Sequence, residues 1–109
     1  MSDRSNVIYV YDGSFDGLMC CVFDSVYRGE RPEAIQPEGD GRGSIFEVHY
    51  VETDEGRAKR VRDAVRTKIS SNALSFVKKA FLAELENKGV TQEMIMGYIM
   101  EDTKGEIGV

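Results

Sequence analysis

A chain of 109 residues fits one compact domain, and its 41% of apolar residues is ordinary for a globular protein and excludes wholesale disorder. Its formal charge of −5 disfavours a general nucleic-acid binder, and no apolar run reaches the roughly 18 residues that a membrane span needs. Because no apolar signal core follows the polar start, we expect one cytoplasmic domain over residues 1–109, ordered over about 6–101 and frayed over 102–109.

The first expected element is a buried strand over residues 7–11, where Val-Ile-Tyr-Val-Tyr is apolar on both faces. Asp12 and Gly13 then predict a turn, and the hydroxyl of Ser14 can cap a helix that ends at Arg28 and Gly29. Its apolar stripe has helical spacing and consists of Phe15, Leu18, Met19, Val22, Phe23 and Val26. Phe23 lies in the middle of this stripe, so we expect it in the core.

The turn before this helix, with Asp12, Gly13, Ser14 and Gly17, has two interpretations. A helix start offers free N–H groups, and glycines let a ligand approach the backbone, so the turn could hold a phosphate. However, the carboxylates of Asp12 and Asp16 would repel an anion, and the spacing is not that of a phosphate loop. A structural turn with a capping serine is therefore the favoured interpretation.

The next stretch is expected to be a loop followed by a strand. Residues 30–43 contain both prolines, several glycines and many charges, which predicts a loop. Residues 44–52 alternate between apolar and polar side chains, which predicts a half-buried strand with Phe46, Val48 and Tyr50 on its buried face.

The candidate metal and nucleophile residues do not form a complete site. Glu47 and His49 share the polar strand face and could bind a metal or move a proton, but the chain has no other histidine, so an exposed strand face is favoured. Cys20 and Cys21 are adjacent, lack zinc-site spacing, and are expected to be reduced and partly buried rather than catalytic with His49. We expect no metal and no cofactor, and no catalytic residue can be assigned.

Three helices are expected in the rest of the chain. Thr53 and Asp54 start the first, whose stripe is Ala58, Val61, Val65 and Ile69. Residues 70–72, Ser-Ser-Asn, cap the second, whose stripe is Leu74, Val77, Phe81 and Leu85 and whose end is Lys88–Gly89. Phe76 and Phe81 are both expected in the core. Thr91 opens the third, with Met94, Ile95, Tyr98 and Ile99 inward.

These elements predict an α+β fold with two short strands, paired in parallel through a helix crossover and packed against about four helices. A two-stranded sheet is marginal by itself, so it must pack on the helices or find further strands. The last helix carries Met94, Met96 and Met100, which point in more than one direction, so we expect it to form a surface that meets more protein.

Positive charge is concentrated in one region of an otherwise acidic chain, and there only Asp63 opposes it. The cations there are Arg57, Lys59, Arg60, Arg62, Arg66, Lys68, Lys78 and Lys79. On the first of the three helices, Lys59 and Arg66 should project outward, Arg60 should lie on the other flank, and Arg62 should lie near the buried boundary. Lys59, Arg60, Arg62 and Arg66 are therefore candidate contacts to the DNA backbone, and the alternative is a solvated helix face.

Three stretches of the chain resemble a bacterial family described as probable DNA metabolism or DNA repair proteins. They are YVYDGSFDGLMCCVFDSVYRGERPEAI, VETDEGRAKRVRDAVRTKIS and ALSFVKKAFLAELENK, and the opening YDGSFDGL is among their most specific parts. The resemblance implies a companion of a radical-SAM protein similar to DNA photoproduct lyases, in a domain that other members join to a uracil-DNA-glycosylase-like domain. Longer members carry a second half, and this chain resembles the first.

The resemblance and the basic region together favour an accessory, non-catalytic module of a DNA repair or DNA metabolism system that acts with an enzyme partner. Two alternatives stay open. One is a protein–protein adaptor that never contacts DNA, and the other is an enzyme whose site is completed by the second half of the longer members.

Overall fold

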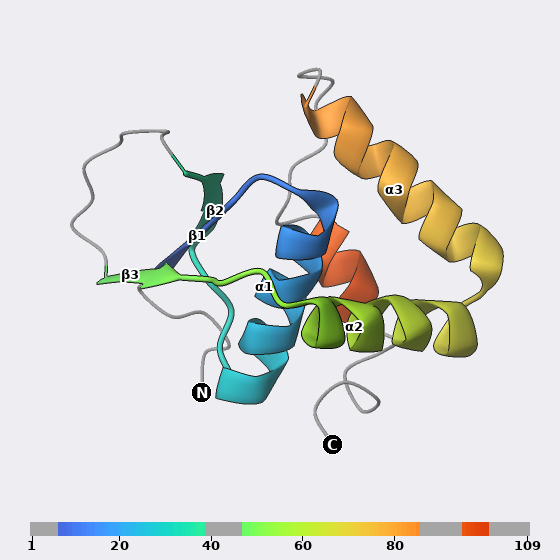
Figure 1. Ribbon diagram of the computed structural model, residues 1–109, viewed down its shortest axis with the longest axis horizontal. Coiled ribbons are helices and arrows are strands. Elements are labelled where there is room, and N and C mark those ends of the chain that lie inside the picture. Colours follow the sequence, from blue (N-terminus) through green and yellow to red (C-terminus); the bar gives the residue numbers. More distant parts are fainter. Residues whose placement is uncertain (1–6, 39–46, 86–94, 101–109) are drawn as a thin grey trace.

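The computed structural model describes residues 7–38, 47–85 and 95–100, and its architecture is the predicted α+β fold (Figure 1). The elements in chain order are β1 (Val7–Tyr11), α1 (Phe15–Arg28), β2 (Ala34–Pro37), β3 (Glu47–Tyr50), α2 (Glu55–Lys68) and α3 (Ser71–Leu85). Residues 95–100 are also helical. None of the helices in these ranges combines the length and the apolar character that a membrane span requires.

The sheet has three parallel strands in the order β2-β1-β3, so the expectation of two strands was one strand short. The strand that was not predicted is β2, which lies inside the segment expected to be a loop. It pairs with β1 from Ile8 opposite Ala34 to Tyr11 opposite Pro37. Pro37 is tolerated because it ends an edge strand. The four residues Ala-Ile-Gln-Pro are too short to give a strand signal of their own, and they become a strand because they pair with the free edge of β1.

The face of β3 is the reverse of the predicted one. His49 lies opposite Tyr9, whose side chain is in the core, so His49 is on the side of the sheet that α1 covers. Val48 and Tyr50 lie on the other side and are 38% and 71% exposed. The alternation was correct, but the polar face turns inward because α1 offers it polar partners. Phe46, which we expected on the same face as Val48 and Tyr50, lies outside the described residues.

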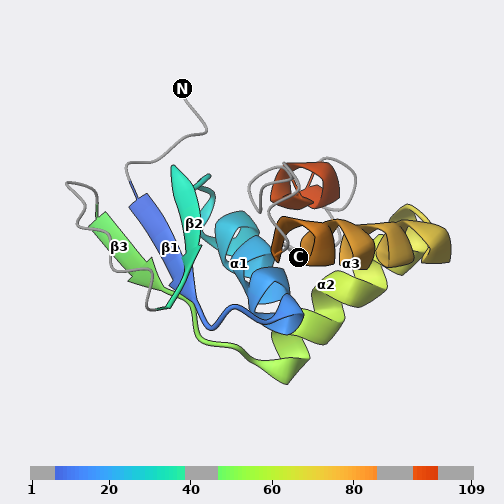
Figure 2. The same cartoon turned by 90° about the horizontal axis from the view of Figure 1, so that it is seen from above.

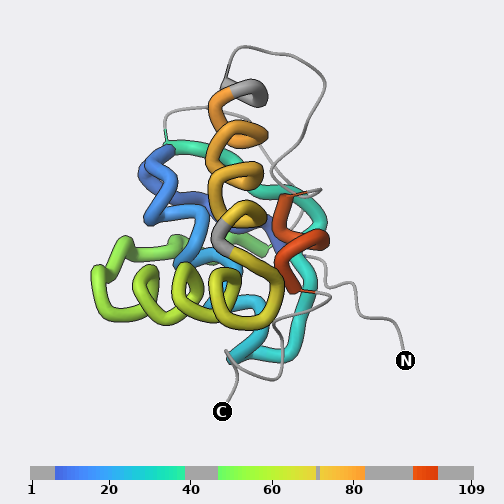
Figure 3. The backbone as a smooth tube through the Cα atoms, turned by 90° about the vertical axis from the view of Figure 1, so that its right-hand side faces the viewer, coloured from blue at the N-terminus to red at the C-terminus, as the bar shows by residue number. Residues whose placement is uncertain are grey.

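Three layers build the domain (Figure 2). The sheet is one layer, α1 packs against it, and α2 and α3 lie beyond α1. Seen from the side of the outer layer, α3 rises from the end of α2, and the short helix of residues 95–100 lies beside α3 (Figure 3). The outer helical layer therefore faces away from the sheet.

The helix ends follow the predicted capping chemistry. Ser14 Oγ accepts a hydrogen bond from Gly17 N at 2.9 Å, and the side chain of Asp54 accepts one from Arg57 N at 2.8 Å. Ser70 Oγ accepts one from Ala73 N at 3.0 Å. Gly29 ends α1 in the left-handed region, with φ at 66°. The predicted helix end at Lys88–Gly89 and the helix start at Thr91 lie outside the described residues.

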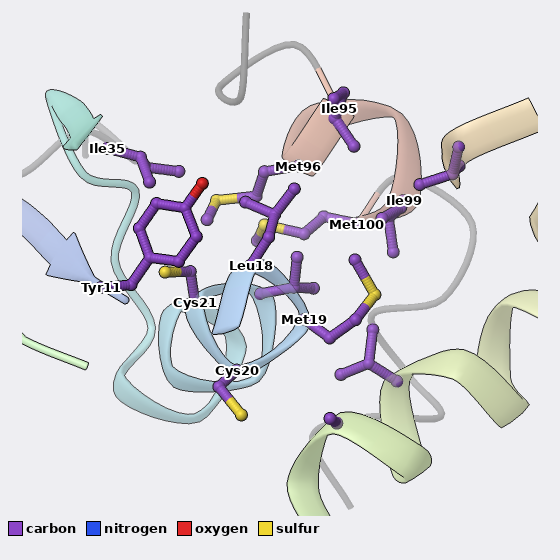
Figure 4. Packing of buried hydrophobic residues seen from close by; sticks show 14 of the residues in the cluster. Tyr11, Leu18, Met19, Cys20, Cys21, Ile35, Ile95, Met96, Ile99 and Met100 are labelled. Atoms are coloured by element: carbon purple, nitrogen blue, oxygen red, sulfur yellow. The ribbon is translucent and has the colours of Figure 1, made fainter. Parts of the chain in front are cut away.

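The core lies between α1 and its neighbours (Figure 4). Leu18 and Met19 are fully buried there, and Met96 and Met100 of the short helix pack into the same cluster. The expectation that the methionines of this helix form a partner surface is therefore wrong for Met96 and Met100. Met94 lies outside the described residues, as does the tail over 102–109.

Three aromatic residues that we expected inside are not fully buried. Phe23 is partly buried and stacks on Tyr27 with ring centroids 6.0 Å apart. Phe76 is 60% exposed and Tyr98 is 42% exposed, whereas Phe81 is buried as expected. Phe76 lies outside the apolar stripe of α3, and the buried side of the helix is formed by residues that include Ala73, Val77 and Phe81.

Candidate functional site

The turn after β1 is held together by the side chain of Asp12. Asp12 Oδ1 accepts hydrogen bonds from Ser14 N at 2.9 Å and from Ser14 Oγ at 2.6 Å, and Thr53 Oγ1 donates to Asp12 Oδ2 at 2.8 Å. Burial acts to raise the pKa of Asp12, but the bonds from Ser14 and Thr53 outweigh it and lower that pKa below its ordinary value. Asp12 is thus an ionised acceptor that ties the end of β1 to the segment before α2.

Gly13 and Gly17 are both required by the local structure, the first for its backbone conformation and the second for the space around it. Gly13 has φ at 87°, a region that side chains with a Cβ rarely adopt. A Cβ on Gly17 would meet the carboxylate of Asp12 and would lie 2.8 Å from the ring of Tyr11. The hydrogen-bonding groups of Ser14 are used within the turn, as is the N–H of Gly17. These contacts support the structural interpretation of the motif over a phosphate site.

A groove lies at the carboxyl end of the parallel sheet, next to this turn. It has a volume of about 720 Å³ and is lined by Gly13, Ser14, Phe15, Asp16, Thr53, Lys78, Phe81 and Leu82. Lys78 Nζ lies 5.8 Å from the centre of the Phe15 ring, and the Phe15 and Phe81 rings meet edge to face. A smaller hollow of about 220 Å³ lies on the other side of Asp12 and Thr53, between the ends of the strands.

Asp24 of α1 contacts polar side chains of both β3 and α2. Its Oδ2 lies 3.0 Å from His49 Nε2, its Oδ1 accepts a hydrogen bond from Arg57 Nη1 at 3.2 Å, and its side chain is only 12% exposed. The predicted partner of His49 was Glu47, which is exposed. Asp24 could have been found from the sequence as the one carboxylate within the largely apolar run of residues 18–26, four residues after Cys20.

This cluster brings a carboxylate, an imidazole and a guanidinium together, but its geometry is that of a structural link. Asp24 contacts the imidazole with one oxygen and the guanidinium with the other, so both of its oxygens are already occupied. Within the described ranges there is no group of three or more His, Cys, Asp or Glu side chains that could hold a metal ion.

Both cysteines are free, as predicted, and they are fully buried where partial burial was expected. Cys20 Sγ accepts a hydrogen bond from Asp54 N at 3.2 Å and donates to Asp54 O at 3.3 Å. Burial raises the pKa of both thiols, and for Cys21 the rise is large. Because a thiol with a raised pKa is a poor nucleophile, Cys20 acts as a contact between α1 and the start of α2.

Five of the six cations of α2 divide into an inner and an outer group, and the sixth, Lys68, is exposed at the last position of the helix. Arg62 is 18% exposed and bonds to Asp16 at the start of α1 and to Glu55, the latter at 2.9 Å. Arg57 is held by Asp24 and lies over the ring of Phe23 at 5.9 Å. Two of the helix's arginines therefore connect α2 to α1 and to its own first turn.

The outer group is Lys59, Arg60 and Arg66, all exposed. Lys59 Nζ lies 2.7 Å from Asp63 Oδ2, and Arg66 bonds to the other oxygen of the same carboxylate. Hydrogen bonding by Lys59 lowers the pKa of Asp63, so the carboxylate is ionised, and the three side chains together keep one positive charge. Of the four predicted DNA contacts, the structure brings Lys59 and Arg66 together and directs Arg62 to the interface between α1 and α2.

No family model, no curated protein and no solved structure matches the chain. Its chemistry is therefore inferred from its own residues and from the sequence resemblance given above.

Proposed function

We propose that this chain is a cytoplasmic accessory module of a bacterial DNA repair or DNA metabolism system, which acts beside an enzyme and contacts the DNA backbone through the outer face of α2. The observation that carries the proposal is the charge of this helix. Six cations and two carboxylates lie on α2, which leaves four positive charges in a chain whose formal charge is −5. The sequence resemblance supplies the setting, with a radical-SAM or uracil-DNA-glycosylase-like enzyme as the partner.

The two groups of cations on α2 differ in their ability to contact a phosphate. Arg57 and Arg62 already hold carboxylates of α1, so moving them to a phosphate would break links that support the fold. Lys59, Arg60 and Arg66 lie on the exposed surface of α2 and project from a helix whose opposite side is buried by Ala58, Val61 and Val65. We therefore assign the phosphate contacts to the outer group.

Asp63 has a defined part in this proposal. It holds the side chains of Lys59 and Arg66 in place, and it also offsets part of their charge. A phosphate that approaches the outer group would compete with Asp63 for the same donors. Binding through these side chains should be independent of DNA sequence, sensitive to salt, and weak for the isolated chain because the remaining surface is acidic.

The test is fluorescence anisotropy with labelled duplex and single-stranded oligonucleotides at several salt concentrations. Replacing Lys59 and Arg66 together by glutamine should weaken binding on all sequences alike and lower the slope of log affinity against log salt by about 0.9 for each lost contact. Asp63→Asn should strengthen binding and steepen the slope. Glu52→Gln is the matched control, because it makes the same charge change at an exposed site outside α2.

Two outcomes would contradict the proposal. If Asp63→Asn and Glu52→Gln raise affinity equally, the effect is one of net charge and α2 has no particular contact. If the chain binds neither form of DNA at low salt, the second candidate, a protein–protein adaptor, becomes the better one. The observation that favours the adaptor is the set of large exposed apolar side chains, which includes Tyr27, Tyr50, Phe76, Leu82 and Tyr98.

A further inference from the structure

An exposed stripe of unusual composition runs along α3. Phe76 is 60% exposed and Leu82 is 56% exposed, and Lys79 lies exposed between them at a spacing of three residues. Residues three apart are neighbours on a helix surface, so these side chains form one continuous row. Residues 72–82 contain two lysines and no carboxylate, so the row lies on a basic segment.

Tyr98 of the short helix adds a second ring to this row. The rings of Phe76 and Tyr98 meet edge to face, with centroids 5.8 Å apart and planes at 61°. Their sequence neighbours, Val77 and Ile99, are fully buried. The two aromatic side chains are therefore anchored from behind by the core and form a fixed pair on the surface.

Phe76 lies on α3, which packs against the basic helix α2. The helix α3 rises from the end of α2 in the layer beyond α1, and the helix of residues 95–100 lies beside α3 (Figure 3). A polyanion bound along these helices would therefore contact aromatic side chains and cations on adjacent surfaces.

We propose that Phe76 and Tyr98 form a stacking platform for unpaired bases, so that the module prefers single-stranded over duplex DNA, with Lys79 beside the platform on the phosphates. This inference rests on the proposed function, that the chain contacts DNA. Aromatic side chains stack on any base but can reach it only where the bases are unpaired, and cations along the same surface follow the backbone. The row alternates apolar side chains with a lysine, and residues 72–82 contain no carboxylate, so its charge complements that of a phosphate backbone.

The first test compares a single-stranded oligo(dT) with a duplex of the same length. Phe76→Ala and Tyr98→Ala should each weaken binding to oligo(dT) by about five- to a hundredfold, because stacking on one side chain contributes about 1–3 kcal/mol, and should leave duplex binding nearly unchanged. Tyr50→Ala is the matched control, since Tyr50 is 71% exposed on the face of the sheet turned away from α1.

The second test uses a tryptophan reporter, since the chain contains no tryptophan. Phe76→Trp keeps an aromatic ring on the platform, so it should retain oligo(dT) binding, and its fluorescence should be quenched on saturation. Tyr50→Trp should bind equally well with no quenching. This pair of variants keeps the test valid even if an alanine variant is less stable.

The outcomes separate this inference from the proposed function. If the chain binds DNA but prefers duplex, or if Phe76→Trp is no more quenched than Tyr50→Trp, the platform is wrong and the contact through α2 stands. If DNA binding is absent at low salt, both proposals fail and the aromatic pair is assigned to a protein partner.

Discussion

Thr53 Oγ1 donates a hydrogen bond to Asp12 Oδ2 at 2.8 Å, although the two residues are 41 positions apart in the sequence. Asp12 directly follows the central strand β1, and Thr53 lies between the edge strand β3 and α2. The bond therefore joins the carboxyl ends of two neighbouring parallel strands. It lies between the groove of about 720 Å³ and the smaller hollow, because Thr53 lines both.

The Asp12 carboxylate makes stability depend on pH. Its folded pKa is lowered, so its contribution to stability is complete above the unfolded pKa, near 3.9, and is lost as the pH falls through the lower folded value. We expect Asp12→Asn to be less stable than the parent chain at pH 7 and the gap to shrink as the pH falls below the unfolded pKa of the carboxyl. Urea denaturation of both chains between pH 7 and pH 2.5 measures this gap. A gap that is constant over the whole range would show that the charge of Asp12 is not involved.

Gly17 should be intolerant of even one methyl group. Gly17→Ala would push a Cβ into the Asp12 carboxylate and to within 2.8 Å of the Tyr11 ring, so we expect a loss of about 1–3 kcal/mol although alanine favours helices. Gly56→Ala is the control, because that Cβ would meet only Asp54 Oδ2 at 3.3 Å. If Gly17→Ala melts at or above the parent's temperature, the turn has more room than the structure indicates.

The elements with strong local signals were predicted from the sequence. The caps at Ser14, Asp54 and Ser70 and the glycine conformations at Gly13 and Gly29 are all observed, because each depends on contacts within a few residues. The features that failed depend on distant partners. The strand β2 exists because β1 offers it an edge, and the inward turn of His49 depends on Asp24, which is 25 residues away in the chain.

In the candidate site, too, the long-range partners of the side chains could not be predicted from the sequence. The sequence locates the basic helix, but it cannot tell that Arg62 is held by Asp16, 46 residues earlier, while Lys59 and Arg66 share the nearby Asp63. Phe76 was expected in the core although it lies outside the apolar stripe of its helix, and the structure leaves its ring 60% exposed.

Asp24 is expected to be the most important polar side chain for folding. Asp24→Ala would leave His49 and Arg57 without the carboxylate that both contact, in a region where the Asp24 side chain is only 12% exposed. The expected loss is about 1–3 kcal/mol. Asp63→Ala, at an exposed carboxylate that also binds two cations, is the control and should change stability little. Equal losses in the two variants would mean that burial does not distinguish these ion pairs.

Arg62 and Lys59 carry the same charge on the same helix, but their removal should have different consequences. Arg62→Met would break the links to Asp16 and Glu55 that join α2 to α1, so we expect a loss of about 1 kcal/mol or more in the free energy of unfolding. Lys59→Met removes an exposed pair with Asp63 and should leave stability nearly unchanged.

DNA binding should show the opposite order for the same two variants. Each loses one positive charge, so any difference between them reflects position rather than net charge. Lys59→Met should lower the salt slope of binding by about 0.9, whereas Arg62→Met should lower it by much less at temperatures where it is folded. Urea denaturation and anisotropy on the same protein samples measure both quantities. If Arg62→Met keeps the parent's unfolding midpoint and flattens the salt slope, then Arg62 belongs to the DNA contact and its ion pairs with Asp16 and Glu55 do not hold the helices together.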